Sequence, residues 1–112
     1  MRSYARYRFP STYLSYARLT HAILRGVNLR GAVLEFTELT GADLTGANLT
    51  GANLKHIKLN DVDLSGADLT GADLRCINFK GANLTGAVLT DVKVCGATLD
   101  TASLVPIFLM PV

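Results

Sequence analysis

The stretch GADLTGANLTGANL, residues 41–54, writes nearly the same five letters three times in succession. A period of five matches neither the 3.6-residue period of an α-helix nor the two-residue period of a flat strand. The chain therefore requires a structure whose geometry repeats every five residues.

The five-residue repeat extends over most of the 112-residue chain when its central Leu is taken as an anchor. Of the twenty anchor positions from 14 to 109, eighteen are Leu, and the exceptions are Phe79 and Val94. The residue two before the anchor is Ala in twelve cases, and all ten glycines stand two after it. Two inward residues and three outward residues per repeat predict a strand-like step followed by a corner.

The glycine position is the predicted corner. A Gly at this place indicates a type II turn, whose second central residue needs a positive φ. Where Gly is missing, the following inward residue is often larger, and we expect a different turn type with more room inside. These corners are Phe36-Thr37, His56-Ile57, Asp61-Val62, Cys76-Ile77 and Asp91-Val92.

A second period of twenty sorts the corners. Positions 26, 46, 66 and 86 are all Gly, whereas positions 16, 36, 56 and 76 are Tyr, Phe, His and Cys. A chain that turns every five residues closes a square in twenty. About five coils fit between residues 11 and 110, and at about 4.8 Å per coil they would make a prism about 24 Å tall.

The run Ala42-Asp43-Leu44-Thr45-Gly46, like Ala67-Asp68-Leu69-Thr70-Gly71, resembles the motif of the pentapeptide-repeat family. The resemblance implies an all-β fold, a right-handed quadrilateral β-helix with the Leu ladder on its axis, and no catalytic activity. Members occur in cyanobacteria and other bacteria, and some resemble duplex DNA and bind DNA gyrase. We expect a basic arm at 1–10, the β-helix at 11–104 and an apolar cap or dimerisation tail at 105–112.

The charge of the chain is unevenly distributed. Residues 1–30 hold six Arg and no acid, giving +6, while residues 31–112 hold nine acids and five bases, giving −4. The Arg-rich start could contact nucleic acid or a membrane directly, or serve as a transit peptide. We expect a cytoplasmic protein, with organelle or thylakoid targeting as the alternative.

Enzymatic chemistry finds little support in the sequence. Paired carboxylates can act as acid and base, and Asp43, Asp63, Asp68 and Asp73 are conspicuous. They are explained more simply as the outward, solvated column of the repeat. His21 and His56 fall on different faces of a twenty-residue coil, and no spacing matches a metal site. We therefore predict no enzyme, no catalytic residue, no metal and no cofactor.

One wall differs from the others and is the candidate partner surface. Large outward rings can mark a contact surface, and charged columns accompany them. In these columns Glu38 would lie between Arg18 and Lys58, and Glu35 beside Lys55, as intramolecular ion-pair ladders. The candidate residues are Tyr16, Arg18, Phe36, Glu38, His56 and Lys58.

Two features concern covalent and non-covalent association. Stacking makes Cys76 and Cys95 diagonal neighbours on adjacent coils, roughly 6 Å apart between Cα atoms, so a disulfide is an alternative to the expected free thiols.

The apolar end of the chain predicts an end-to-end homodimer, because an open coil end exposes unpaired backbone. A tail that plugs its own coil is the alternative. The residues concerned are Ile107, Phe108, Leu109 and Met110.

Two functions follow from the sequence. The first is a non-enzymatic structural or protein-interaction module whose partner is unknown. The alternative, by resemblance, is a DNA-mimic binder of a type II topoisomerase such as DNA gyrase. Mimicry needs a long acidic face, which a −4 segment beside six Arg supplies poorly.

Overall fold

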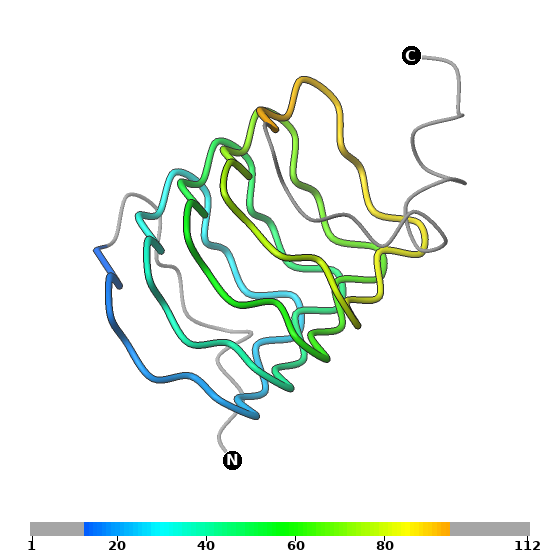
Figure 1. Cartoon of the computed structure of the whole chain (residues 1–112). Coiled ribbons are helices and arrows are strands. Elements are labelled where there is room, and N and C mark those ends of the chain that lie inside the picture. Colours follow the sequence, from blue (N-terminus) through cyan, green and yellow to red (C-terminus); the bar gives the residue numbers. More distant parts are fainter. Residues whose placement is uncertain (1–12, 95–112) are drawn as a thin grey trace.

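The computed structural model describes residues 13–94, which wind into one continuous four-sided coil (Figure 1). Successive turns of the coil, coloured from blue to orange along the sequence, lie side by side along one axis. Within this range, thirteen parallel β-bridges join residues twenty positions apart, from Tyr13–Val33 to Asp73–Lys93. The twenty-residue coil predicted from the sorted glycines is therefore confirmed.

Each wall contributes a single paired residue per turn. For this reason residues 13–94 contain parallel β-pairing but neither a helix nor a continuous strand. The bridged columns define four walls: the first wall is Tyr13, Val33, Asn53, Asp73 and Lys93, the second Arg18, Glu38, Lys58 and Asn78, the third Ile23, Asp43, Asp63 and Asn83, and the fourth Asn28, Asn48, Asp68 and Val88.

The core consists of the anchor residues and of the residues two positions before them. Every anchor from Leu24 to Leu84 is buried, including Phe79, as the five-residue pattern predicts. Thr37 is a buried polar side chain, and its hydroxyl donates a hydrogen bond to the Leu14 carbonyl at 2.9 Å. Since this bond satisfies the hydroxyl, Thr37 can occupy an inward position without a large desolvation cost.

Backbone hydrogen bonds join each coil to the next. The Leu44 amide donates to the Asp63 carbonyl at 2.8 Å, and the Asp63 amide donates to the Ala42 carbonyl at 3.0 Å. The same two-bond pattern recurs along the walls. A single coil has no such partners by itself, so stability comes from stacking neighbouring coils.

The corners differ less from one another than the sequence predicts. Nine glycine corners have φ of 68–79°, and the seven non-glycine corners within residues 13–94 keep a positive φ of 59–66°. The expected change of turn type therefore does not remove the left-handed residue. Larger inward residues do accompany some of these corners, since Ile57 and Ile77 are buried there. The turn hydrogen bond is 3.4 Å long at two of the non-glycine corners, from the Ile57 amide to the Leu54 carbonyl and from the Val92 amide to the Leu89 carbonyl.

Candidate functional site

Three aromatic side chains stack on the outside of one corner of the coil. The ring centroids of Tyr16 and Phe36 are 5.2 Å apart and those of Phe36 and His56 are 4.8 Å apart, with interplanar angles of 7° and 3°. Tyr16 is 72% exposed and Phe36 43%, and His56 is exposed as well. We call these three residues the ring corner. The structure thus places the predicted column of rings together on the surface.

The ring corner uses side chains where the backbone favours glycine. Tyr16, Phe36 and His56 have φ of 66°, 62° and 60°. A left-handed conformation costs a residue with a Cβ roughly 1–2 kcal/mol. Stacking of a ring pair contributes about 0.5–1.5 kcal/mol. Three residues carry this cost and only two ring pairs stack, so the rings bring no net stability to the fold.

The charged ladders predicted beside the rings do not form. Arg18, Glu38 and Lys58 are bridged through their backbones in the predicted order. Even so, no nitrogen–oxygen distance of 4 Å or less joins their side chains anywhere in the described coil. All three side chains are exposed, and an exposed ion pair returns only about 0–1 kcal/mol. The opposite charges therefore stay solvated.

The second predicted ladder, between Glu35 and Lys55, is also wrong, since no ion pair joins the two side chains in the described coil. Glu35 Oε1 accepts a hydrogen bond from Asn53 Nδ2 at 3.2 Å. Asn53 lies 18 residues further along the chain, which makes it a diagonal neighbour on the next coil.

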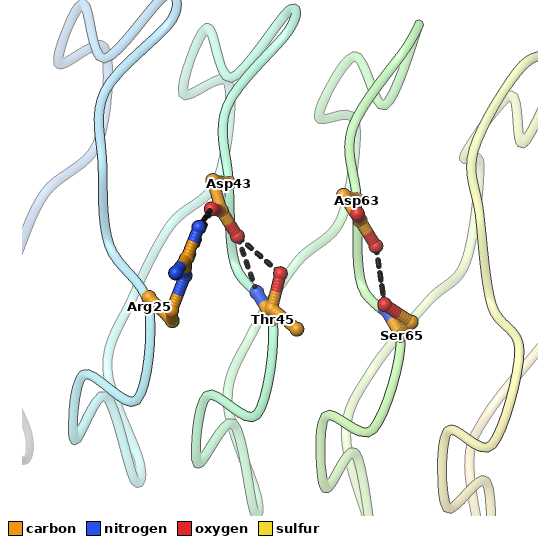
Figure 2. Close-up of polar contacts among 5 residues, drawn as sticks. All are labelled: Arg25, Asp43, Thr45, Asp63 and Ser65. Carbon is orange, nitrogen blue, oxygen red and sulfur yellow. Dashed lines mark hydrogen bonds and ion pairs between the residues drawn. The ribbon is translucent and has the colours of Figure 1, made fainter.

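Ion pairs occur elsewhere in the coil, at positions that sequence reasoning missed. Arg25 Nη2 lies 2.7 Å from Asp43 Oδ2, and Arg75 Nη2 lies 2.7 Å from Asp73 Oδ2. Figure 2 shows Arg25 reaching from one coil to Asp43 on the next. The spacing of 18 is the signal that could have revealed this pair, because it is two residues short of a full coil.

The conspicuous aspartates accept hydrogen bonds from the residue two positions later in the chain. Asp43 Oδ1 accepts hydrogen bonds from the Thr45 amide, at 3.0 Å, and from the Thr45 hydroxyl. Asp63 binds Ser65 in the same way, at 3.0 Å from the amide and 2.6 Å from the hydroxyl (Figure 2). Asparagines accept the corresponding hydrogen bond from a backbone amide, as Asn48 Oδ1 does from the Thr50 amide at 3.1 Å. These side chains fix the turn after each anchor, which is the use of Asx turns elsewhere. The column is therefore half-buried structure as well as a solvated surface.

These contacts lower the pKa of three carboxyl groups. The Thr45 hydroxyl lowers the pKa of Asp43 most, against opposing desolvation, and the Arg25 guanidinium adds to the effect. The Thr70 hydroxyl and then the Thr70 amide lower the pKa of Asp68. The pKa of Asp73 is lowered first by its hydrogen bond from Arg75. Acids held ionised by the fold support a structural role for this column.

Acidification should therefore destabilise the coil. Because the folded pKa values are depressed, the stabilisation is present above the unfolded pKa of about 3.9 and is lost as pH falls through the folded values. The melting temperature should drop between neutral pH and about pH 3. A variant with Asp43, Asp68 and Asp73 changed to Asn keeps a side-chain oxygen that accepts from the backbone amide, as Asn48 does. Its melting temperature should therefore drop less on acidification. Equal drops in the two proteins would contradict this account.

The remaining predicted site residues are separated. His21 lies at a different corner from His56, with its ring over Gly41. In the described range no group of three His, Cys, Asp or Glu could hold a metal ion. Cys76 has a free, exposed thiol. Its proposed diagonal neighbour Cys95 lies outside the described residues, so the distance between the two cysteines stays a prediction.

Both ends of the sequence lie outside residues 13–94. The basic arm at 1–10, with its nucleic-acid or membrane contact, stays a prediction. The same holds for the tail at 105–112 and for the homodimer through Ile107, Phe108, Leu109 and Met110. Within the described coil, no helix is long and apolar enough to cross a membrane.

Comparison with known proteins gives a consistent result. A family model described as pentapeptide repeats matches in eight copies, over residues 12–51, 28–66, 47–86 and 63–100. Proteins of this family form right-handed quadrilateral β-helices and are generally structural or interaction modules. No curated protein matches the chain.

Solved structures of this family resemble the chain. A pentapeptide repeat protein from the Arabidopsis thaliana thylakoid lumen is 30% identical, with a TM-score of 0.50, 82% of this chain and 72% of that chain being covered. One from Nostoc PCC 7120 is 28% identical with a TM-score of 0.50, and the match covers 90% of this chain and 79% of that chain. The protein Rfr23 from the cyanobacterium Cyanothece 51142 is 32% identical with a TM-score of 0.44, covering 83% and 60%. This chain thus spans less than two thirds of Rfr23.

Proposed function

Because this chain belongs to the pentapeptide-repeat family, we propose that it is a non-enzymatic interaction module that contacts a protein partner through its ring corner. The observation that carries the proposal is the exposed, parallel stack of Tyr16, Phe36 and His56. The coil is taken to be a right-handed quadrilateral β-helix of about five turns in all. It supplies a rigid support, and the ring corner supplies the contact.

The first argument concerns what the fold itself needs at this corner. Glycine occupies nine corners of the described coil with a positive φ. A glycine at position 16, 36 or 56 would relieve the backbone strain there. The rings are present at a conformational cost that stacking only offsets. Strained positions of this kind often serve function.

The second argument concerns the chemistry of the surface. Aromatic and arginine side chains dominate the binding energy of many protein interfaces. Two aromatic rings and one imidazole line a single edge here, and Arg18, Glu38 and Lys58 form an exposed polar column beside them. An apolar centre with a charged rim is the usual anatomy of an interface.

The topoisomerase alternative has weaker support from the charges. A DNA mimic must present a long acidic face. The third and fourth walls carry Asp43, Asp63 and Asp68, and Asp43 is paired with Arg25. A gyrase supercoiling assay with and without the protein tests this alternative directly, since a mimic must inhibit supercoiling.

The location of the protein forms part of the same proposal. We place the module in the cytoplasm. The Arabidopsis thaliana relative, from the thylakoid lumen, makes that compartment the alternative. Fractionation of the source cells separates the two.

A triple variant tests the interaction. Tyr16→Gly, Phe36→Gly and His56→Gly together remove the rings while adopting the residue found at nine other corners. Immobilised wild-type protein and variant are exposed to an extract of the source cells, and bound proteins are quantified by mass spectrometry. Specific partners of the wild type should fall about 30-fold, the equivalent of one hot-spot residue. The melting temperature should change little.

The matched control is Val88→Asn, on the fourth wall. Val88 is 43% exposed, as Phe36 is, and Asn occupies the same column at positions 28 and 48. This variant should retain the partners. Equal retention by the wild type and the triple-glycine variant would refute the ring corner as the contact surface.

A further inference from the structure

Basic residues are sorted by wall in a way that the linear sequence hides. In the described coil no base occupies a bridged position of the third or fourth wall, and Arg25 and Arg30 stand only at their corners; from residue 31 to residue 94, five bases stand on the first and second walls or at a corner that adjoins one of them. Three of these five are near His56 in the coil: Lys55 and Lys58 on either side of it in the sequence, and Arg75 one coil above Lys55. The five are Lys55, Lys58, Arg75, Lys80 and Lys93.

Two of the bases beside His56 are free of ion pairs. Lys55 and Lys58 bracket His56 in the sequence, and Ile57 between them points into the core. No carboxylate of the described residues lies within 4 Å of either ammonium group. Arg75, by contrast, is bound to Asp73 at 2.7 Å. Arg18, in the same column as Lys58, also has no ion pair in the described coil, so three cations flank the ring corner, with the unpaired Glu38 between Arg18 and Lys58.

The stack also determines what the rings can contact. Phe36 lies between two parallel rings, at 5.2 Å and 4.8 Å, so both of its faces are covered and its 43% exposure comes from its edge. Cations and nucleobases bind ring faces, while the electropositive ring edge favours oxygen acceptors. The exposed edge of Phe36, like the two lysines, is thus suited to a partner that presents oxygens with negative charge.

Resting on the proposed function, we propose that Phe36, Lys55, His56 and Lys58 dock a carboxylate-rich segment of the partner protein. Other polyanions fit the surface less well. Single-stranded nucleic acid binds by stacking bases on open ring faces; both faces of Phe36 are covered, and the stack leaves only the outer faces of Tyr16 and His56. Duplex DNA and anionic membranes require many basic contacts, whereas the described residues beside the ring corner supply only three cations without an ion pair, Arg18, Lys55 and Lys58.

The probe for this site is a short fluorescein-labelled peptide of alternating Glu and Ser, with a peptide of Gln and Ser as its uncharged counterpart. Fluorescence anisotropy at low salt measures binding to the full-length protein. The Glu peptide should bind and the Gln peptide should not. Binding should weaken as salt is added, because exposed charges are screened.

The test variant is Lys55→Thr with Lys58→Asn, and the control is Lys80→Asn. Thr stands at the equivalent place of other repeats, as at Thr45, and Asn78 follows Lys58 in its column, so the variant fits the fold. Asn60 precedes Lys80 in the same way. We expect about tenfold weaker binding of the Glu peptide by the test variant and less than about twofold by the control.

Several outcomes would overturn the inference. They are equal affinity for the two peptides, equal losses in the two variants, or tighter binding of phosphatidylglycerol vesicles or a single-stranded oligonucleotide than of the Glu peptide. The partner capture described above separates this failure from that of the proposed function. If the lysine variant keeps the captured partners and the triple-glycine variant loses them, the interaction module stands and its preference for carboxylates is wrong.

Discussion

Replacing Leu64 with Ala should lower the free energy of unfolding by about 2–5 kcal/mol. Leu64 is 1% exposed and lies midway along the described coil. The substitution removes buried methyl groups and leaves a cavity in the ladder. The size of the loss depends on whether the neighbouring coils can close that cavity.

The surrounding backbone resists such a collapse. The Leu64 amide is bonded to the Asn83 carbonyl at 2.8 Å, and the adjoining Asp63 amide is bonded to the Ala42 carbonyl at 3.0 Å. These bonds hold the coils on both sides at their spacing. The cost should therefore lie well above that of a substitution at a site that can relax.

Urea denaturation measures this effect, with Leu64→Met as the control. Met nearly conserves the volume, so its cost should stay below about 1.5 kcal/mol. The dependence of unfolding free energy on urea should keep its slope in both variants, which shows that the same surface is exposed on unfolding. A loss below about 1 kcal/mol for Leu64→Ala would show that Leu64 contributes far less than its burial indicates.

The second large effect is expected at Gly81, whose replacement by Ala should cost about 2–3 kcal/mol. Gly81 has a φ of +79°, and a Cβ there would lie 3.0 Å from Asp61 Oδ1 and 3.2 Å from the Asp61 amide nitrogen. The side chain could move away, but the amide belongs to the neighbouring coil. Ala would therefore meet both backbone strain and crowding.

Gly71→Ala is the matched control, since Gly71 has a φ of +70° and a Cβ there would meet nothing within 4 Å. It should cost only the strain, about 1–2 kcal/mol. The difference between the two variants in urea denaturation isolates the crowding by Asp61. Equal costs would mean that the coils shift to admit the methyl group.

The corner column that contains Gly81 alternates between residues with a side chain and glycines, and this crowding explains the alternation. Its residues are His21, Gly41, Asp61 and Gly81. A Cβ at Gly41 would meet the His21 ring, just as one at Gly81 meets Asp61. Each side chain covers the glycine of the next coil. The ring corner differs because its flat side chains stack, and so no glycine is needed between them.

The architecture followed from the sequence because it depends on contacts that recur with the periods of five and twenty residues in the chain. The inward position of Leu64 depends on the period of five, and the pairing of Asp43 with Asp63 on the period of twenty. The stacking of Phe36 on Tyr16 depends on the same period. Every repeat carries the same information, so an irregular residue such as Phe79 does not obscure it.

The polar contacts depended on the tertiary structure. Arg25 pairs with Asp43, and Glu35 bonds to Asn53, across a diagonal that a count of twenty does not indicate. The positive φ of Phe36 was likewise not evident, because a large residue there suggests a different turn. The repeat fixes where each backbone position lies. Which of several neighbours a flexible polar side chain reaches is decided by its length, its rotamer and the competition with water, and these differ from one repeat to the next.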